Sequence, residues 1–291
     1  MAAPSDLVVR PLAEEDVPAA ERVGWEALRA LWPPEFVPPD DELRASRGQL
    51  RMRHLRATDP DGCFVAEVEG RIAGVALSLL REDVWGLSLL GVHPDFQGRG
   101  VGAAVLAPAL DHGAGARGGI IAASTDARAL KRYVRAGFDA LPCLSAAGAL
   151  NASRIPDGLR ARPGDVEADR ATLDAASRQA RGASHAVDLP AIIAMGGRLL
   201  VHEDRGFAVE RDGAPVLLAA LDDEAATDLL WSCFAQAAPG QSVHVDFIPH
   251  ANDWALRTAL DAGLSLGHEG PIFVRGSTGT FRSYLLSGAF L

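Results

Sequence analysis

The stretch LLGVHPDFQGRGVGAAVLAPAL, Leu89 to Leu110, joins a strand-like apolar run to a helix-like run through a glycine-rich segment. Its centre, QGRGVG at residues 97–102, has the spacing Q-x-x-G-x-G. Successive backbone N–H groups at the start of a helix can converge on a phosphate, and glycines allow close approach and positive φ. The stretch therefore predicts an anion-binding loop, with an ordinary glycine-rich turn as the alternative.

Two other phosphate-binding motifs do not fit this loop. The strand before it alternates and does not begin a long crossover unit, which argues against the dinucleotide fingerprint G-x-G-x-x-G. The sequence also lacks the G-K-[ST] ending of a nucleoside triphosphate loop.

The first half of the chain predicts a mixed α/β layer fold. A strand at 7–10 precedes helical patterns at 16–31 and 43–57, and alternation with a Glu69-Gly70 turn predicts a hairpin over 63–80. A strand at 85–92 leads into the loop and its helix, followed by a buried strand at 116–125 and a short helix at 126–136.

The second half repeats this order without the loop. A polar segment at 151–158 predicts a linker between domains at 1–150 and 159–291. Arg162-Pro163 then recurs where Arg10-Pro11 stands in the first half, and 198–213 echoes the hairpin. After 214–234 there is no Q-x-x-G-x-G spacing, so we infer a duplication in which one copy has lost its loop.

Two motifs resemble those of the GNAT superfamily of N-acetyltransferases. VHPDFQGRGVGAAVL at 92–106 is similar to the family's acetyl-CoA-binding motif, and YVRAGF at 133–138 is similar to its late Y-x-x-x-G-F motif. The resemblance covers most of residues 5–142. It implies two tandem GNAT-like acyl-CoA N-acyltransferase domains, each a mixed, mostly antiparallel sheet flanked by helices, with a degenerate C-terminal copy.

The resemblance also implies where acetyl-CoA, the co-substrate, binds. Amides of the loop would hold the pyrophosphate, and the end of the preceding strand, often beside a bulge, would contact the pantetheine arm. No metal is expected. The cofactor-binding residues are Leu90, Gly91, Val92, Gln97, Gly98, Arg99, Gly100, Val101, Gly102, Ala103 and Asp126.

Acetyl transfer needs a neutral amine and a proton for the departing thiolate. Tyr133 matches the family position that commonly protonates the sulfur, with a core-edge aromatic as the alternative. The base is open: the strand at 85–90 has no carboxylate, and Ser88 could position a water. Six side-chain carboxylates are candidates for the base only because they lie near these elements in the sequence: Glu35, Asp41, Glu67, Glu69, Glu82 and Asp83. Some tandem members of the family place the terminal carboxylate in the active site, which here belongs to Leu291.

The acceptor site in this fold commonly involves the segment between the first two helices. Trp25, Trp32 and Phe36 could form its apolar wall, or could be ordinary packing residues. The acidic run at 40–42 could attract a cationic amine or be a solvated loop. Four histidines of the second half lack metal-ligand spacing and are interpreted as structural or surface residues: His202, His244, His250 and His268.

Composition limits the partners. The 291 residues are 48% hydrophobic with a net charge of −10, which argues against a nucleic-acid-binding surface or an anionic membrane. No apolar run reaches the roughly 18 residues of a membrane span, and the start of the chain lacks a signal-peptide pattern. We expect a cytoplasmic monomer or homodimer with reduced cysteines, and the arginine bias over a single lysine suggests a GC-rich bacterial genome.

These observations predict an acetyl-CoA-dependent N-acetyltransferase that modifies a primary amine of a small molecule or peptide, with its chemistry in the N-terminal domain. One alternative is an enzyme similar to mycothiol synthase, which is also tandem but carries its catalytic copy at the C-terminal end. The other is a non-catalytic acyl-CoA-binding sensor or partner-binding protein, which the missing strand carboxylate favours.

Overall fold

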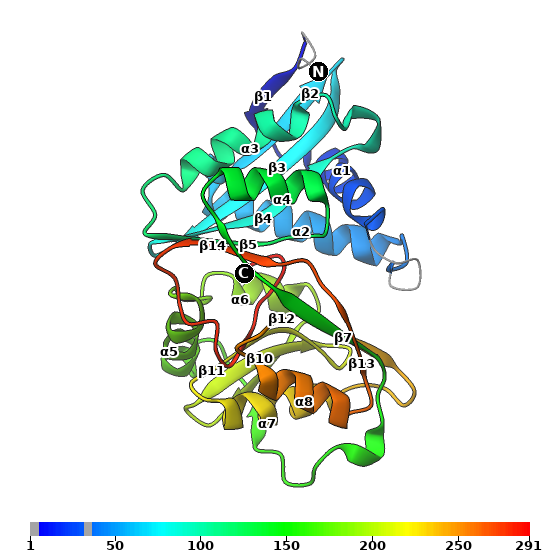
Figure 1. Cartoon of the computed structure of the whole chain (residues 1–291), viewed down its shortest axis with the longest axis vertical. Helices are drawn as coiled ribbons and strands as arrows, with labels where there is room; N and C mark the ends of the chain where they lie inside the picture. Colours follow the sequence, from blue (N-terminus) through cyan, green and yellow to red (C-terminus); the bar gives the residue numbers. More distant parts are fainter. Residues whose placement is uncertain (1–5, 32–36) are drawn as a thin grey trace.

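The structure is a computed structural model that describes residues 6–31 and 37–291. Its first half contains the elements in the predicted order of strand, two helices, hairpin, strand, helix, strand and helix (Figure 1). They are β1 (Val8–Pro11), α1 (Val17–Arg29), α2 (Glu42–Thr58), η2 (Pro60–Gly62), β2 (Cys63–Val68), β3 (Arg71–Arg81), β4 (Val84–Val92), η3 (Pro94–Phe96), α3 (Val101–His112), β5 (Gly118–Ala122), α4 (Ala127–Arg135), β6 (Asp139–Leu141) and β7 (Cys143–Ala149).

The second half repeats strand, helices and hairpin after a short 3-10 turn at the predicted linker. Its elements are η4 (Ala152–Arg154), β8 (Ala161–Pro163), α5 (Arg170–Arg181), α6 (Leu189–Ala194), β9 (Arg198–His202), β10 (Gly206–Arg211), β11 (Ala214–Ala220), α7 (Asp223–Phe234), β12 (Ser242–Pro249), α8 (Asp253–Asp261), β13 (Ser265–His268), β14 (Ile272–Gly276) and β15 (Tyr284–Leu285).

Local sequence signals explain the boundaries of several elements. Helix α1 starts behind Asp16 with a proline in its first turn, where the missing N–H is not needed. Helix α2 starts at Asp41, whose side chain accepts a hydrogen bond from the Arg44 N–H at 2.8 Å. Glu69 and Gly70 both have positive φ, 53° and 72°, as a tight hairpin turn requires.

The two halves exchange strands. Among the described residues, seven strands form one sheet in the order β1-β2-β3-β4-β5-β14-β6, so a late strand of the chain lies between β5 and β6. In return β7 lies between β12 and β13 in a sheet of three strands. A five-stranded sheet, β15-β11-β10-β9-β8, completes the second half. Neighbouring strands are antiparallel except β4 and β5, which are parallel.

Helices cover both faces of the large sheet. Val75 and Leu77 of β3 belong to the buried cluster that includes α1 and α2 residues. Ala76, which points the other way, belongs to the cluster with Val101 and Val105 of α3. Helices α1 and α2 therefore lie on the face opposite to α3.

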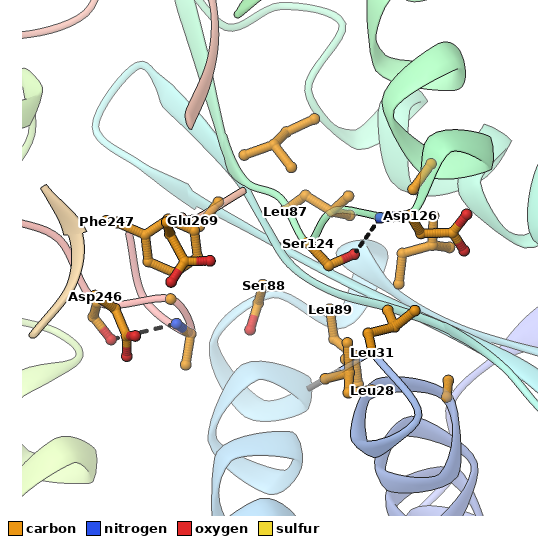
Figure 2. A pocket seen from close by; sticks show the side chains of 18 of the residues that line it. Leu28, Leu31, Leu87, Ser88, Leu89, Ser124, Asp126, Asp246, Phe247 and Glu269 are labelled. Atoms are coloured by element: carbon orange, nitrogen blue, oxygen red, sulfur yellow. Dashed lines mark hydrogen bonds between the residues drawn. The ribbon is translucent and has the colours of Figure 1, made fainter. Parts of the chain in front are cut away.

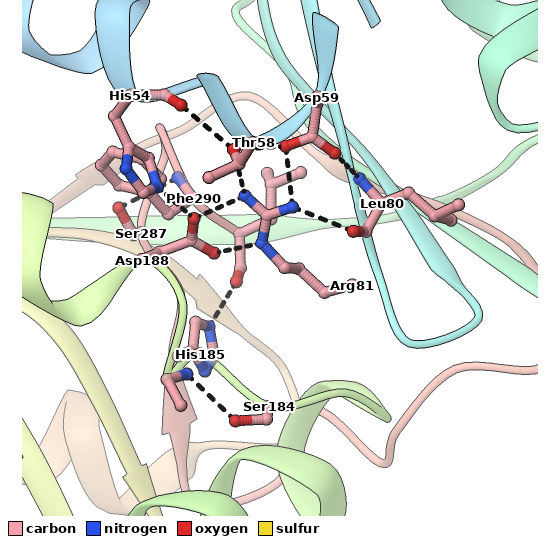
Figure 3. A network of polar contacts seen from close by, with 12 residues as sticks. His54, Thr58, Asp59, Leu80, Arg81, Ser184, His185, Asp188, Ser287 and Phe290 are labelled. Atoms are coloured by element: carbon pink, nitrogen blue, oxygen red, sulfur yellow. Dashed lines mark hydrogen bonds and ion pairs between the residues drawn. The ribbon is translucent and has the colours of Figure 1, made fainter. Parts of the chain in front are cut away.

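A buried ionic network joins the halves where α2 and β3 meet α6 (Figure 3). The Arg81 guanidinium pairs with Asp59 at 2.8 Å and with Asp188 at 2.7 Å, and His54 Nε2 lies 2.8 Å from Asp188. Burial alone would raise the pKa of Asp188, but hydrogen bonds from His54 and Arg81 outweigh it and lower that pKa to about 2. A continuous apolar cluster surrounds the network, so the halves share one core.

Within the described ranges, no helix combines the length and the apolar character that crossing a membrane requires.

Candidate active site

A cavity of about 680 Å³ lies between the two halves. Its walls come from α1, α2, β4, the glycine loop, β5 and α4 of the first half, and from β10, β11, β12 and the C-terminal segment of the second. Figure 2 shows Asp246, Phe247 and Glu269 on one side of Ser88, with Ser124 and Asp126 on the other.

Two neighbouring strands separate at the centre of this cavity. Strands β4 and β5 pair only as far as Leu87 and Ile121, and the strands diverge beyond that pair. The register between β3 and β4 shifts so that Ser88 is the extra residue of a bulge, as the family resemblance implied. The Ser88 hydroxyl is buried and has no hydrogen-bond partner within the described part of the chain. The gap thus leaves backbone groups and one buried hydroxyl without partners at the wall of the cavity.

The glycine loop presents its amides at the end of this gap. Gly100 is the N-cap of α3 with φ of 84°, and no side chain caps the helix. Gly98 has φ of 77°, and a Cβ there would meet open space. In the described structure, the backbone N–H groups of residues 98–102 donate no hydrogen bond. A helix start with unused donors and no side chain in front of it suits an anion such as a phosphate.

Most of the residues predicted from the sequence lie around the cavity. Those that line it are Ser88, Leu90, Val92, Gln97, Gly98, Gly100, Gly102, Asp126 and Tyr133. The Gln97 amide donates to the Val92 carbonyl at 3.1 Å, which braces the turn between strand and loop. Asp126 caps α4 by accepting from the Arg128 N–H at 2.8 Å, and hydrogen bonding to Arg128 lowers its pKa.

The other predicted residues lie elsewhere. Gly91 packs against α1, where a Cβ would be 3.1 Å from Gly24 Cα, and Val101 is buried in the sheet–α3 core. The Arg99 guanidinium stacks over Phe96 at 5.7 Å, and Ala103 is exposed. Trp25 is buried beneath the Arg44 guanidinium, 4.2 Å from its ring, and does not line the cavity. Trp32 and Phe36 lie outside the described residues.

Tyr133 lies on the α4 side of the cavity. It is 4% exposed, with its ring edge against Phe273 of β14 at 5.4 Å. Burial raises the pKa of its phenol, so the group is protonated at neutral pH. Its hydroxyl has no hydrogen-bond partner among the described residues, which leaves its proton available to a ligand.

Sequence reasoning missed the acidic side of the cavity. The His244 Nδ1 lies 2.6 Å from the Asp246 carboxylate, which raises the pKa of this histidine, and Glu269 lies beside them. Burial, followed by the charge of Asp246, raises the pKa of Glu269 to about 7. Among the described residues, no group of three or more such side chains is arranged to hold a metal ion. The arrangement instead resembles a proton-accepting site.

Two backbone features place these carboxylates. Strand β12 has a bulge between Val245 and Ile248, within which Phe247 takes a φ of 49°, uncommon for an aromatic residue. Gly270 packs so tightly on the end of β5 that a Cβ would be 1.8 Å from the Ala123 carbonyl oxygen. Glu269 is therefore fixed at the point where β5 leaves β4. No sequence motif marks it, because only the insertion of β14 brings it there.

The described carboxylates proposed by neighbourhood do not line the cavity. Glu67 and Glu82 pair with Arg10 and Arg178, and Asp41 caps α2. Glu69 and Asp83 are exposed, and Glu35 lies outside the described residues. The main-chain oxygen of Leu291 accepts hydrogen bonds from Arg181 at 2.8 Å and from His185 at 2.5 Å, so it is bound within the core.

Comparisons with known proteins agree with this architecture. Residues 25–138 match the model of the family described as the acetyltransferase (GNAT) family, whereas no curated protein matches the sequence significantly. A solved structure of a putative acetyltransferase from Pyrococcus horikoshii is similar over 99% of this chain and 97% of its own, with 19% identity and a TM-score of 0.78.

Two further structures share the whole architecture. A GCN5-related N-acetyltransferase from Sphaerobacter thermophilus has 18% identity and a TM-score of 0.59 over 97% of this chain and 99% of its own. A tandem GNAT protein from the clavulanic acid biosynthesis pathway has 14% identity and a TM-score of 0.56 over 93% and 98%. The chain thus has a mixed α/β acyl-CoA N-acyltransferase fold. It is a tandem GNAT-fold protein, and the match to the family model lies in its first half.

Proposed function

We propose that this protein is an acetyl-CoA-dependent N-acetyltransferase that acetylates a primary amine at the gap between β4 and β5. The observation that carries this proposal is the single cavity that reaches the uncapped glycine loop, the β4 bulge, Tyr133 and Glu269. An anion site, a gap between strands next to it, a proton donor and a proton acceptor are what this reaction needs in one place.

The residues of the loop fit acetyl-CoA. Gly98 and Gly100 leave room for a bulky anion, and the start of α3 offers amides and a favourable dipole to the pyrophosphate. The backbone of β4 beyond Ser88 is free to bind the pantetheine amides. Bound acetyl-CoA supplies the thioester: a C–N bond forms, the C–S bond breaks, the amine loses a proton and the thiolate gains one.

Glu269 and Tyr133 are the proton-transfer groups in this proposal. An acceptor amine is mostly protonated at neutral pH, so a carboxylate with a pKa of about 7 can remove its proton and also attract its charge. Tyr133, buried and protonated, donates its proton to the sulfur. Ser88 lines the same cavity, between Glu269 and Ser124 in Figure 2, and can orient the acceptor or a water molecule.

The second half acts as the acceptor wall in this proposal and does not bind a second CoA. It contributes Asp246 and Glu269 to the cavity, and the strand that carries the Phe273 contact to Tyr133. We propose that residues 1–150 form the catalytic region and that residues 159–291 form a degenerate copy. This division describes the roles of the two regions, which exchange strands in the fold.

A thiol-release assay with acetyl-CoA and a panel of primary amines tests the proposal. We expect CoA release that depends on an amine and that falls by about 10²-fold or more in Tyr133→Phe, because the thiolate loses its proton donor. Val134→Ala, an exposed change on the same helix, is the matched control and should retain turnover. CoA binding without turnover on any amine would replace this proposal with the acyl-CoA sensor.

A further inference from the structure

Three arginines from the two halves lie at or next to the cavity. Arg47 and Arg51 lie one turn apart on α2, so they share a face of that helix. Arg211 comes from the end of β10 in the other half. A Cβ on Gly196 would lie 3.1 Å from Arg47 Nη2 and 3.8 Å from Arg211 Cδ, so these two side chains meet there. Arg51 and Arg211 both line the cavity.

These arginines differ from their neighbours because they have no acidic partner. On the same helix, Arg44 pairs with Glu21, while Arg53 and Arg56 both pair with Glu14. Across the described residues, no ion pair or hydrogen bond is found for Arg47, Arg51 or Arg211. The Nε atoms of Arg47 and Arg51 are buried without an acceptor; those of Arg44 and Arg56 are too, but these two arginines have acidic partners.

The electrostatic surroundings of this cluster favour an anion. Burial lowers the pKa of Arg51 to about 10, against the opposing effect of Glu21, and burial with the charge of Arg47 lowers the pKa of Arg211 despite the adjacent Asp212. Guanidinium groups that are partly buried and unpaired lose hydration without compensation. A bound carboxylate or phosphate would compensate for the lost hydration through charge-assisted hydrogen bonds to the guanidinium groups.

The position of the cluster separates it from the CoA pyrophosphate. Helix α2 covers the face of the large sheet opposite to α3, whose N-terminus carries the glycine loop. No ion pair within the described chain joins the arginines to Asp246 or Glu269 either. The cavity wall thus carries carboxylates, suited to an amine, and guanidinium groups that are not paired with them, suited to an anion.

We propose that Arg51 and Arg211, supported by Arg47, bind an anionic group of the acceptor, so that the acceptor is a small amine bearing a carboxylate or a phosphate. This inference rests on the proposed function, because it assigns the second charge of that same acceptor. It favours amino acids and aminoalkyl phosphates over polyamines and aminoglycosides, whose additional charges are positive.

Matched acceptor pairs test this inference in the full-length protein. The pairs share an amine and differ in the anion: 4-aminobutyrate with n-butylamine, L-lysine with cadaverine, and O-phosphoethanolamine with ethanolamine. We expect kcat/KM to be about tenfold or more higher for the anionic member of a pair, which is the size of one charge-assisted contact. The first two pairs report on a carboxylate and the third on a phosphate.

Arginine variants then connect that preference to the cluster. Arg51→Gln and Arg211→Gln should each lower kcat/KM for the acceptor that bears the anion by about tenfold, mainly through KM, and leave kcat/KM for its partner without the anion within about twofold. Arg51→Lys should retain part of the preference. Arg53→Gln, on the same helix but paired with Glu14 outside the cavity, is the control and should leave it unchanged.

Binding measurements keep the test independent of turnover. With CoA present, titration of 4-aminobutyrate and O-phosphoethanolamine should show saturable binding that weakens about tenfold in Arg51→Gln, while CoA affinity stays the same. Equal or better use of the amines that lack the anion, or no binding of either anionic probe, would overturn this inference alone. A tenfold loss of CoA affinity in Arg51→Gln would also overturn it, because the arginines would then serve the cofactor. If these probes bind but no amine is acetylated, the proposed function fails and the anion subsite stands.

Discussion

The two halves of this molecule differ most at the helix that follows their central hairpin. In the first half, β4 leads through the glycine loop into α3, whose N-terminus has no side-chain cap. In the second half, β11 leads directly into α7, and the Asp222 carboxylate accepts a hydrogen bond from the Ala225 N–H at 3.0 Å. The N-terminus of α7 is therefore already occupied by the carboxylate of Asp222. One capping residue is thus enough to occupy a helix start that could otherwise bind an external anion.

A second difference runs in the opposite direction. The half without a phosphate loop supplies Asp246 and Glu269 to the cavity, whereas β4 of the first half has no carboxylate. The exchange of β7 and β14 makes this possible, because β14 pairs directly with β5. In the proposed function, one half therefore binds the cofactor and the other binds the acceptor.

The largest expected effect comes from removing the acceptor-side base. Glu269→Gln should lower kcat/KM by about 10²–10⁴-fold, since proton removal from the amine loses its acceptor. In the wild type, kcat/KM should rise with pH through about 7, because Glu269 must lose a proton to act as a base. Stopped thiol-release assays at a series of pH values measure both effects.

The variant should lose the rise near pH 7 and keep only the rise at higher pH that comes from deprotonation of the amine itself. Glu15→Gln, an exposed residue of the first half, is the control. An unchanged pH profile in Glu269→Gln would show that Glu269 is not the base, and the base would then be sought in the first half.

A comparably large effect on stability is expected at the contact that holds the halves together. Arg81→Met leaves Asp59 and Asp188 buried without their partner and should lower the free energy of unfolding by about 3–5 kcal/mol. The Asp188 pKa is depressed to about 2 in the folded protein, so this contribution is present above about pH 4 and is lost as the pH falls toward 2. Urea unfolding at pH 7 and at pH 3 measures it.

Arg178 provides the matched control, because it also pairs across the halves, with Glu82 at 2.8 Å, but at the surface. Arg178→Gln should cost less than about 1 kcal/mol. Equal losses of unfolding free energy in Arg81→Met and Arg178→Gln would show that burial of the Arg81 network adds nothing to stability.

A smaller effect is expected from uncapping the second helix. Asp222→Ala should lower the free energy of unfolding by about 1 kcal/mol, the usual cost of an N-cap, without changing acetylation. Thermal unfolding and the thiol-release assay measure the two quantities. A loss of turnover at unchanged stability would mean that α7 takes part in the reaction.

Local signals predicted much of the fold and half of the site. Spacing and turn residues predicted the element order, the Glu69-Gly70 turn and the α3 loop, because each depends on neighbouring residues. The exchange of strands depends on pairing across most of the chain, and β14 is apolar enough to suit either sheet. Glu269 could not be found for the same reason, since it reaches the cavity only through that exchange. Trp25 was a plausible pocket residue, but α1 turns it into the core.

The most direct test of the contrast between the halves is the stoichiometry of CoA binding by calorimetric titration. We predict one CoA per chain in the wild type and in Asp222→Ala, and a loss of affinity of about tenfold or more in Gly100→Val, where a β-branched residue would have to adopt positive φ in front of the amides. Two CoA molecules per chain, or unchanged affinity in Gly100→Val with the fold intact, would contradict the assignment of the pyrophosphate to the first half.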